Sequence, residues 1–165
     1  MAREFPQVGV VGLGPMGAGI GEVFARHGLS VLAVDKDETA VARGRGHLEG
    51  STQRGVDRGK MTVEEQTALL GRVTFGTEIG VLADADLVVE AVPEQLELKR
   101  AIFTELGTIC KPETILASNT SSLSITEIAV ATGRPGQAVG MHFFNPAPGM
   151  KLAEDVGPGV PEQPV

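Results

Sequence analysis

One histidine and one glutamate bracket the segment HFFNPAPGMKLAE, at His142 and Glu154. An imidazole titrates near neutral pH, so it can take a proton from a reacting group and return it. At this separation a local helix cannot bring the two residues together, whereas two strand ends joined by the loop NPAPG can. A single histidine at a strand end is also often a structural hydrogen bonder. The pair is therefore a candidate for proton transfer, with a structural role as its alternative.

A glycine-rich turn near the N-terminus, GLGPMG, has the spacing G-x-G-x-x-G. It follows the β-rich run QVGVVG and opens a helical pattern, which is the context that a dinucleotide-binding turn requires. Gly12 permits the tight turn, Gly14 lets the backbone approach a pyrophosphate, and Gly17 lets the helix pack close to the strand. The helix N-terminus then offers free N–H groups to the phosphates.

Asp35 ends the next strand, roughly 20 residues further on, where a carboxylate can accept hydrogen bonds from a ribose diol. The same carboxylate repels a 2′-phosphate, so it predicts NAD rather than NADP. Lys36 beside it weakens this preference slightly. The alternative is a glycine turn in an unrelated α/β fold, with Asp35 merely beginning a loop.

Short apolar runs alternate along the chain with longer segments of helical periodicity. Such alternation predicts a parallel sheet covered by helices on both faces. Two capping boxes, TVEE from residue 62 and SITE from residue 124, mark the starts of helices. The expected strands are residues 7–12, 30–35, 72–75, 86–92, 114–118 and 137–143. The expected helices are residues 16–27, 38–59, 62–71, 98–109 and 124–133.

The composition is that of an ordinary globular domain, with 42% apolar and 21% charged residues in a chain of 165. A net charge of −7 argues against binding to nucleic acid or to an anionic membrane. No apolar run reaches the ~18 residues that span a bilayer, and MAREFPQ has no signal-peptide pattern. The single cysteine, Cys110, excludes an internal disulfide and a multi-cysteine metal site. We expect it to be a small buried hydrophobe at a helix end, in a cytoplasmic protein without a metal centre.

Four motifs occur in the order GLGPMG, VVEAVPEQLELKR, SNTSSL and HFFNPAPGMKLAE. From about residue 8 to residue 154 the chain resembles the NAD-binding domain of the L-3-hydroxyacyl-CoA dehydrogenases, particularly the 3-hydroxybutyryl-CoA members. The resemblance implies a Rossmann-type α/β fold, doubly wound around a mainly parallel sheet, with an inserted helical hairpin. It also implies NAD-dependent oxidation of a 3-hydroxyacyl-CoA to a 3-ketoacyl-CoA, a reaction of β-oxidation and fatty acid metabolism.

The same resemblance assigns roles to individual residues. His142 matches the catalytic base, and Glu154 matches the glutamate that holds the other ring nitrogen. Ser121 matches a serine that hydrogen-bonds the reacting oxygen of the substrate, although NTSS is also a good helix-entry sequence and Ser121 could be a cap. Asn145 matches an asparagine near the substrate. The positions that match the NAD site are Glu94, Lys99 and Asn119.

Residues 43–60 hold five basic residues against two acidic ones. In the family, the corresponding helices contact the CoA part of the substrate. The resemblance implies that Ser51, together with Arg58 or Lys60, contacts the CoA phosphates. The alternative is a solvated helix face. Glycines inside this helix each cost up to ~1 kcal/mol against alanine, so they predict an arm that is frayed or ordered only with ligand. They are Gly44, Gly46, Gly50 and Gly55.

The family places a helical domain, which closes the substrate cleft and makes the dimer contact, after the NAD-binding domain. We expect residues 1–154 to form the NAD-binding domain and residues 155–165, rich in proline and glycine, to form a disordered tail. Without the helical domain we expect poor or no activity, unless a homo-oligomer or a separate helical partner completes the site. Two alternatives stay open: a truncated NAD-binding module that catalyses nothing, and a hydroxy-acid dehydrogenase of the 3-hydroxyisobutyrate type.

Overall fold

A seven-stranded sheet in the order β3-β2-β1-β4-β5-β6-β7 forms the centre of the computed structural model, which describes residues 5–120, 125–142 and 154–156. Strands β1 to β6 run parallel, and β7 pairs with β6 in the antiparallel direction. Chain order reverses at β1, which has β2 on one side and β4 on the other, so the predicted doubly wound sheet is confirmed. The strands are β1 (Gln7–Val11), β2 (Ser30–Val34), β3 (Val73–Gly76), β4 (Leu87–Glu90), β5 (Ile115–Ser118), β6 (Ala138–His142) and β7 (Glu154–Val156).

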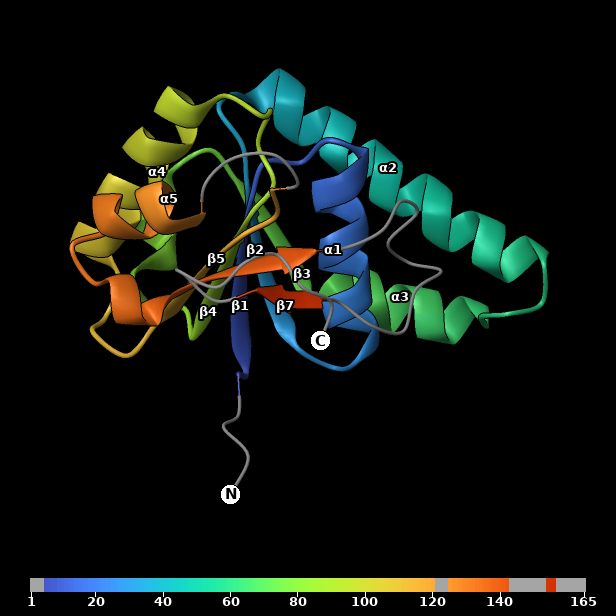
Figure 1. Cartoon of the computed structure of the whole chain (residues 1–165). Coiled ribbons are helices and arrows are strands. Elements are labelled where there is room, and N and C mark those ends of the chain that lie inside the picture. The colour runs from blue at the N-terminus through green and yellow to red at the C-terminus, as the bar shows by residue number, and fades with distance from the viewer. Residues whose placement is uncertain (1–4, 121–124, 143–153, 157–165) are drawn as a thin grey trace.

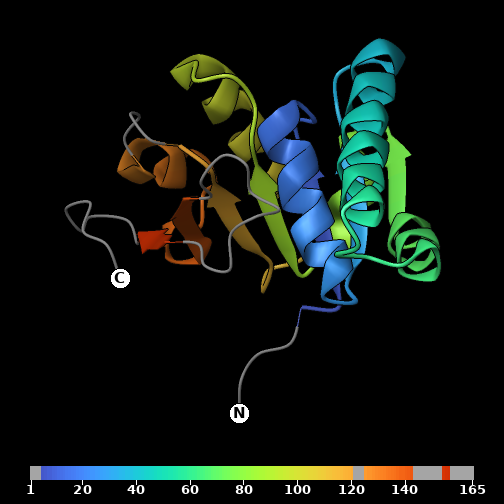
Figure 2. The same ribbon diagram turned by 90° about the vertical axis from the view of Figure 1, so that its right-hand side faces the viewer.

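Helices cover both faces of this sheet, with α1 to α3 on one side and α4 and α5 on the other (Figure 1). Figure 2 shows α1 and α2 side by side. Between β2 and β3, α2 and α3 form the predicted helical hairpin. No helix in the described part of the chain is long and apolar enough to cross a membrane. The α-helices are α1 (Pro15–Arg26), α2 (Glu38–Asp57), α3 (Val63–Gly71), α4 (Leu96–Ile109) and α5 (Ile125–Ala131), and the 3-10 turns are η1 (Ile79–Asp84) and η2 (Pro135–Gln137).

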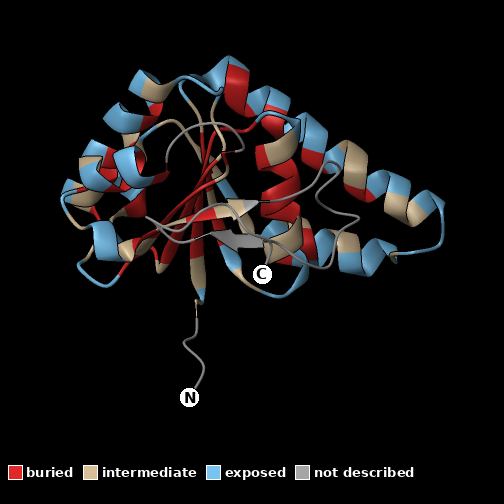
Figure 3. Ribbon diagram, in the orientation of Figure 1, coloured by how far each residue is buried: buried red, intermediate tan, exposed pale blue. Residues whose placement is uncertain are grey.

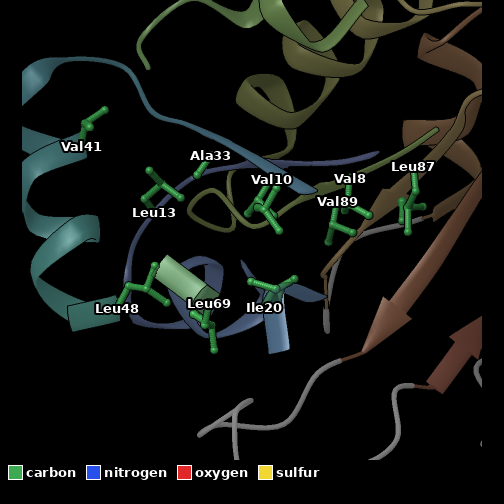
Figure 4. Close-up of a cluster of buried hydrophobic side chains, with 13 residues drawn as sticks. Val8, Val10, Leu13, Ile20, Ala33, Val41, Leu48, Leu69, Leu87 and Val89 are labelled. Carbon is green, nitrogen blue, oxygen red and sulfur yellow. The ribbon is translucent and has the colours of Figure 1, made fainter. Parts of the chain in front are cut away.

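Two apolar clusters hold the layers together, one on each face of the sheet. Figure 4 shows the first, to which Ile20, Leu48 and Leu69 contribute from three different helices. The second contains Phe103 and Leu106 of α4, which pack against strand residues. In Figure 3 the central strands β1, β2, β4 and β5 and helix α1 are largely buried, whereas the far end of the α2–α3 hairpin is mostly exposed or half-buried. The hairpin therefore projects from a core that is complete without its tip.

Capping residues mark the ends of several helices. Asp37 caps α2 by accepting a hydrogen bond from the Ala40 N–H at 2.8 Å. Thr62 and Glu65 form the predicted capping box of α3. Beyond α1, Gly28 has φ +89°, a conformation that favours glycine at the end of a helix. The box that begins at residue 124 lies partly outside the described residues, and α5 is described from Ile125.

Helix α2 is a single uninterrupted helix, in place of the frayed arm that its glycines predict. One of these glycines is required by packing. A Cβ at Gly44 would lie 2.5 Å from the Leu13 Cβ, so the absent side chain lets α2 approach the glycine-rich turn. The helical propensity lost at Gly44 is offset by this close contact, which a sequence pattern does not reveal.

Strand β7 covers Glu154–Val156, so it includes two residues of the segment that the sequence assigns to a tail. The strand pairs with β6 and extends the sheet past the expected last residue of the domain. The sequence of this Pro- and Gly-rich segment does not predict a strand, because pairing with β6 determines its conformation. The division of the chain at residue 154 stays a prediction.

We expect the Cys110 thiol to react slowly with a disulfide reagent in the native protein. Cys110 follows the end of α4, is 6% exposed and contributes to the second cluster, as predicted for a small buried hydrophobe. Burial raises the pKa of the thiol, and the nearby Arg134 guanidinium only partly offsets this, so little thiolate forms at pH 8. Timed reaction with Ellman's reagent checks this, with guanidine-unfolded protein as the fast control; a burst of reaction in native buffer would contradict it.

Candidate functional site

A groove of about 1040 Å³ opens at the carboxyl ends of β1, β2, β4 and β5. Its lining comes from the glycine-rich turn, the end of β2, the turn between β4 and α4, and the residues after β5. In open α/β sheets this edge, at the point where strand order reverses, is where ligands bind. The cofactor-site residues that the sequence predicts and the groove brings together are Gly12, Gly14, Asp35, Glu94 and Asn119.

The glycine-rich turn fits the roles predicted for it. Gly12 has φ +95°, and a Cβ there would lie 2.8 Å from the backbone of Ala91. A Cβ at Gly17 would overlap the Gly12 carbonyl oxygen, so only glycine lets α1 pack this close to β1. At Gly14, by contrast, an added Cβ meets nothing within 4 Å. Gly14 also lines the groove and is the N-cap of α1, so backbone N–H groups there are accessible to a phosphate.

Asp35 lies in the groove and anchors the glycine-rich turn. Its carboxylate accepts hydrogen bonds from the Leu13 N–H at 2.8 Å and from the Lys36 N–H at 2.7 Å. Each carboxylate oxygen has a further lone pair, so Asp35 can accept hydrogen bonds from a diol without releasing the turn. The same residue therefore sets the shape of the turn and presents a negative charge to the ligand.

Glu94 and Asn119 face the groove, and beneath them lies a buried ionic network. The Lys99 ammonium, 0% exposed, contacts Glu90 Oε2 at 2.5 Å and Glu94 Oε1 at 3.1 Å. Ser118 Oγ donates to Glu90 Oε1 at 2.6 Å. Burial raises the pKa of the Glu90 carboxyl, because desolvation outweighs the lowering effect of the Lys99 charge and of the hydrogen bonds.

Lys99 differs from its prediction as a residue that lines the cofactor site. Its side chain is fully buried below the groove, and it reaches the lining through contacts with Val92 and Glu94. The sequence reasoning also missed Glu90, Ser118 and Thr120, whose hydroxyl donates to Glu94 Oε2 at 2.8 Å. One signal was present: Glu90 is a charged residue inside the apolar run DLVVEAV, where an ion needs a buried partner.

A second pocket, of about 460 Å³, lies between α1 and the α2–α3 hairpin. Its lining includes Ser51, Arg58 and Lys60, the three residues predicted to meet the CoA phosphates. Arg26 and Arg54 also line this pocket, as do the two carboxylates of Glu22 and Glu65. Because arginine and lysine side chains outnumber the acidic ones, the pocket and its serine hydroxyl suit a phosphate group.

The candidate proton-transfer residues end β6 and begin β7. Backbone pairing sets His142 directly opposite Glu154 in the antiparallel ladder. Directly opposite positions in such a ladder have α-carbons about 4.5–5.5 Å apart, so the two strand ends do bring these residues together. Because β6 is parallel to β1 and β4, His142 lies at the carboxyl edge of the sheet, the edge that opens into the groove. Ser121 and Asn145 lie outside the described residues.

Comparison with known proteins gives a consistent family. The sequence profile of "3-hydroxyacyl-CoA dehydrogenase, NAD binding domain" matches residues 7–159. A probable 3-hydroxybutyryl-CoA dehydrogenase from Deinococcus radiodurans is 48% identical over 146 residues, which are 88% of this chain and 52% of the relative. A 3-hydroxyadipyl-CoA dehydrogenase from Escherichia coli is also 48% identical, over 90% of this chain and 31% of the relative.

Solved structures lead to the same family. The crystal structure of FadB2 from M. tuberculosis superimposes with a TM-score of 0.91 at 43% identity, covering 93% of this chain and 54% of that one. The chain thus spans about half the length of several of the relatives that it matches. With profile, sequence and fold in agreement, the chain belongs to the NAD-binding domain family of the 3-hydroxyacyl-CoA dehydrogenases, whose cofactor is NAD.

Proposed function

We propose that the chain is the NAD-binding half of a dehydrogenase that oxidises a 3-hydroxyacyl-CoA to a 3-ketoacyl-CoA, in fatty acid metabolism. The observation that carries the proposal is the pairing of His142 with Glu154 at the carboxyl edge of the sheet. The glycine turn and Asp35 open into the same edge. A proton acceptor and a dinucleotide site at one edge suit the removal of a proton and a hydride from one alcohol carbon.

The dinucleotide fits the groove through three parts of the chain. Gly14 leaves room for a pyrophosphate at the N-terminus of α1, Asp35 can accept hydrogen bonds from a ribose diol, and Glu94 and Asn119 line the far wall. When bound, NAD supplies the hydride acceptor.

The chain's own residues handle the proton and the substrate. In the proposal, His142 takes the hydroxyl proton, and Glu154 holds the imidazole in the required tautomer and stabilises its cationic form. Ser121 hydrogen-bonds the reacting oxygen, and Asn145 lies beside the substrate. Ser51, Arg58 and Lys60 meet the CoA phosphates in the second pocket, which is basic in the way that the phosphates require.

Production of NADH from NAD and 3-hydroxybutyryl-CoA by the purified chain tests the activity. We expect His142→Ala to remove any turnover above background, because the imidazole that takes the hydroxyl proton is then missing. If His142→Ala and the wild type produce NADH at the same rate, catalysis by the chain alone is rejected. The NAD-binding module that catalyses nothing would then be favoured.

A second polypeptide extends the test. We propose that a helical domain completes the substrate cleft, and that a polypeptide of that kind can supply it in trans. Adding the helical half of a 3-hydroxybutyryl-CoA dehydrogenase should then raise the rate of the wild type but not of His142→Ala. The cytoplasm is the compartment that we propose, on the ordinary globular composition of the sequence and its use of a single cysteine.

Cofactor preference depends on Asp35. We expect the wild type to bind NADH at least about 10-fold more tightly than NADPH, because a buried or half-buried carboxylate beside a 2′-phosphate costs several kcal/mol. Asp35→Asn should reduce the difference in affinity between NADH and NADPH while keeping a hydrogen-bond acceptor for the Leu13 N–H. Titration calorimetry with both dinucleotides measures it, and tighter binding of NADPH by the wild type would contradict the assignment.

A further inference from the structure

The buried lysine below the groove has every donor of its ammonium occupied. An ammonium has three N–H groups, and three acceptors surround Lys99 Nζ: Glu90 Oε2 at 2.5 Å, Glu94 Oε1 at 3.1 Å and the Val92 carbonyl at 3.3 Å. Glu90 is in the sheet, whereas Val92 and Glu94 both belong to the turn after β4 and line the groove. Lys99 therefore ties the groove wall to the core.

Glu90 holds the other side of this connection. Lys99 and the Val92 N–H, at 2.7 Å, donate to Oε2, and Ser118 donates to Oε1. Three donors on one carboxyl group match the ionised form, which only accepts. The backbone of Val92 is thus held at both its N–H and its carbonyl oxygen, so the turn has little freedom to shift.

The turn that these contacts hold is itself part of the groove. Ala91, Val92, Pro93, Glu94 and Gln95 all line it. The turn also packs against the glycine-rich turn, because a Cβ at Gly12 would come within 2.9 Å of Ala91 and Val92 backbone atoms. A small displacement of the turn would therefore change the width of the groove.

We infer that Glu90 is a positioning residue for the dinucleotide: through Lys99 it fixes the turn of residues 91–95 and holds the Glu94 carboxylate at the groove wall. An apolar pair of similar volume would fill this part of the core without the desolvation of two ions, so stability alone does not call for the pair. The inference rests on NAD binding by the proposed dehydrogenase half. It assigns the specific task of orienting Glu94 to a residue that does not touch the groove.

The inference is tested by measuring the Kd for NADH of the Glu90→Gln variant of the full chain by titration calorimetry. The variant keeps the shape of the side chain but removes the charge that holds Lys99, so Lys99 shifts towards Glu94 and the turn loosens. We expect the Kd for NADH to rise at least about 10-fold. Glu97→Gln is the matched control: Glu97 is in the same helix as Lys99, its side chain is 86% exposed, and its ion pair is with the surface residue Arg100, so the Kd of this variant should equal that of the wild type.

The double variant Glu90→Gln/Lys99→Met separates positioning from folding. It removes both charges, so its denaturation midpoint should return towards the wild-type value even if Glu90→Gln alone unfolds. Its Kd for NADH should stay raised at least about 10-fold, because Glu94 has lost its lysine. A double variant with wild-type affinity, or a folded Glu90→Gln with wild-type affinity, would overturn the inference. Failure of the wild type itself to bind NADH would instead reject the proposed function.

Discussion

Alanine at position 17 is expected to lower NADH affinity by at least about 100-fold and to destabilise the fold by roughly 3 kcal/mol. The added Cβ would overlap the Gly12 carbonyl oxygen, so the first turn of α1 must move away from β1. That movement takes the N-terminal N–H groups of the helix away from the position of the phosphates. Calorimetry with NADH and guanidine unfolding measure the two effects.

Two other glycines serve as controls for Gly17→Ala. Gly46→Ala introduces a Cβ with nothing within 4 Å, in an exposed part of α2, and should keep NADH affinity and add up to ~1 kcal/mol of stability. Gly14→Ala should fold normally, since its Cβ also meets no protein atom and its φ is −65°, but should weaken NADH binding by entering the groove. If Gly17→Ala binds NADH like the wild type, the close packing of the turn is not what builds the site.

Lys99→Met is expected to destabilise the protein by about 3–5 kcal/mol, the cost of leaving one member of a buried ion pair without its partner. Glu90 would be left 0% exposed without the ammonium that pairs with it. Lys111→Met is the matched control. Lys111 pairs with Asp86 at 2.6 Å, but its side chain is 31% exposed, so solvent screens this pair and the loss of stability should be much smaller than for Lys99→Met.

The loss of folding stability caused by Lys99→Met should be larger at high pH than at low pH. Burial already raises the pKa of Glu90, and removing Lys99 removes the charge and hydrogen bond that oppose the rise. In the folded variant Glu90 then binds a proton more tightly than in the unfolded chain. The stability of the variant therefore falls as pH rises through the raised pKa of Glu90. Guanidine unfolding should therefore show a smaller difference from the wild type at pH 5 than at pH 7.5. An equal difference at both would show that Glu90 does not become an unpaired charge.

The architecture was predictable because it follows from local signals. Alternating apolar runs predict the parallel strands, Thr62 and Glu65 predict the start of α3, and Gly12 with Gly17 predicts the turn that the structure contains. Each of these signals lies within a few residues of the feature that it determines. The order of the strands then follows from the doubly wound pattern.

The network below the groove was not predictable in the same way. Glu90 and Ser118 are distant in sequence and meet only because β4 and β5 pair in register. Lys99 matched the family position for a cofactor residue, but the sequence cannot tell a side chain that lines a groove from one that supports the lining from below. Gly44 is similar, since its contact with Leu13 depends on how α2 crosses the turn.

Strand β1 has its two neighbours from very different parts of the chain. β2 follows it closely, but β4 arrives much later, and the Gln7 N–H donates to Asp86 Oδ2 across a separation of 79 residues. A ribosome adds about 5–20 residues per second, so one edge of β1 stays unpaired for several seconds during synthesis. A nascent chain that stops before β4 has an open central strand, and chaperones or other nascent chains can pair with it in that interval.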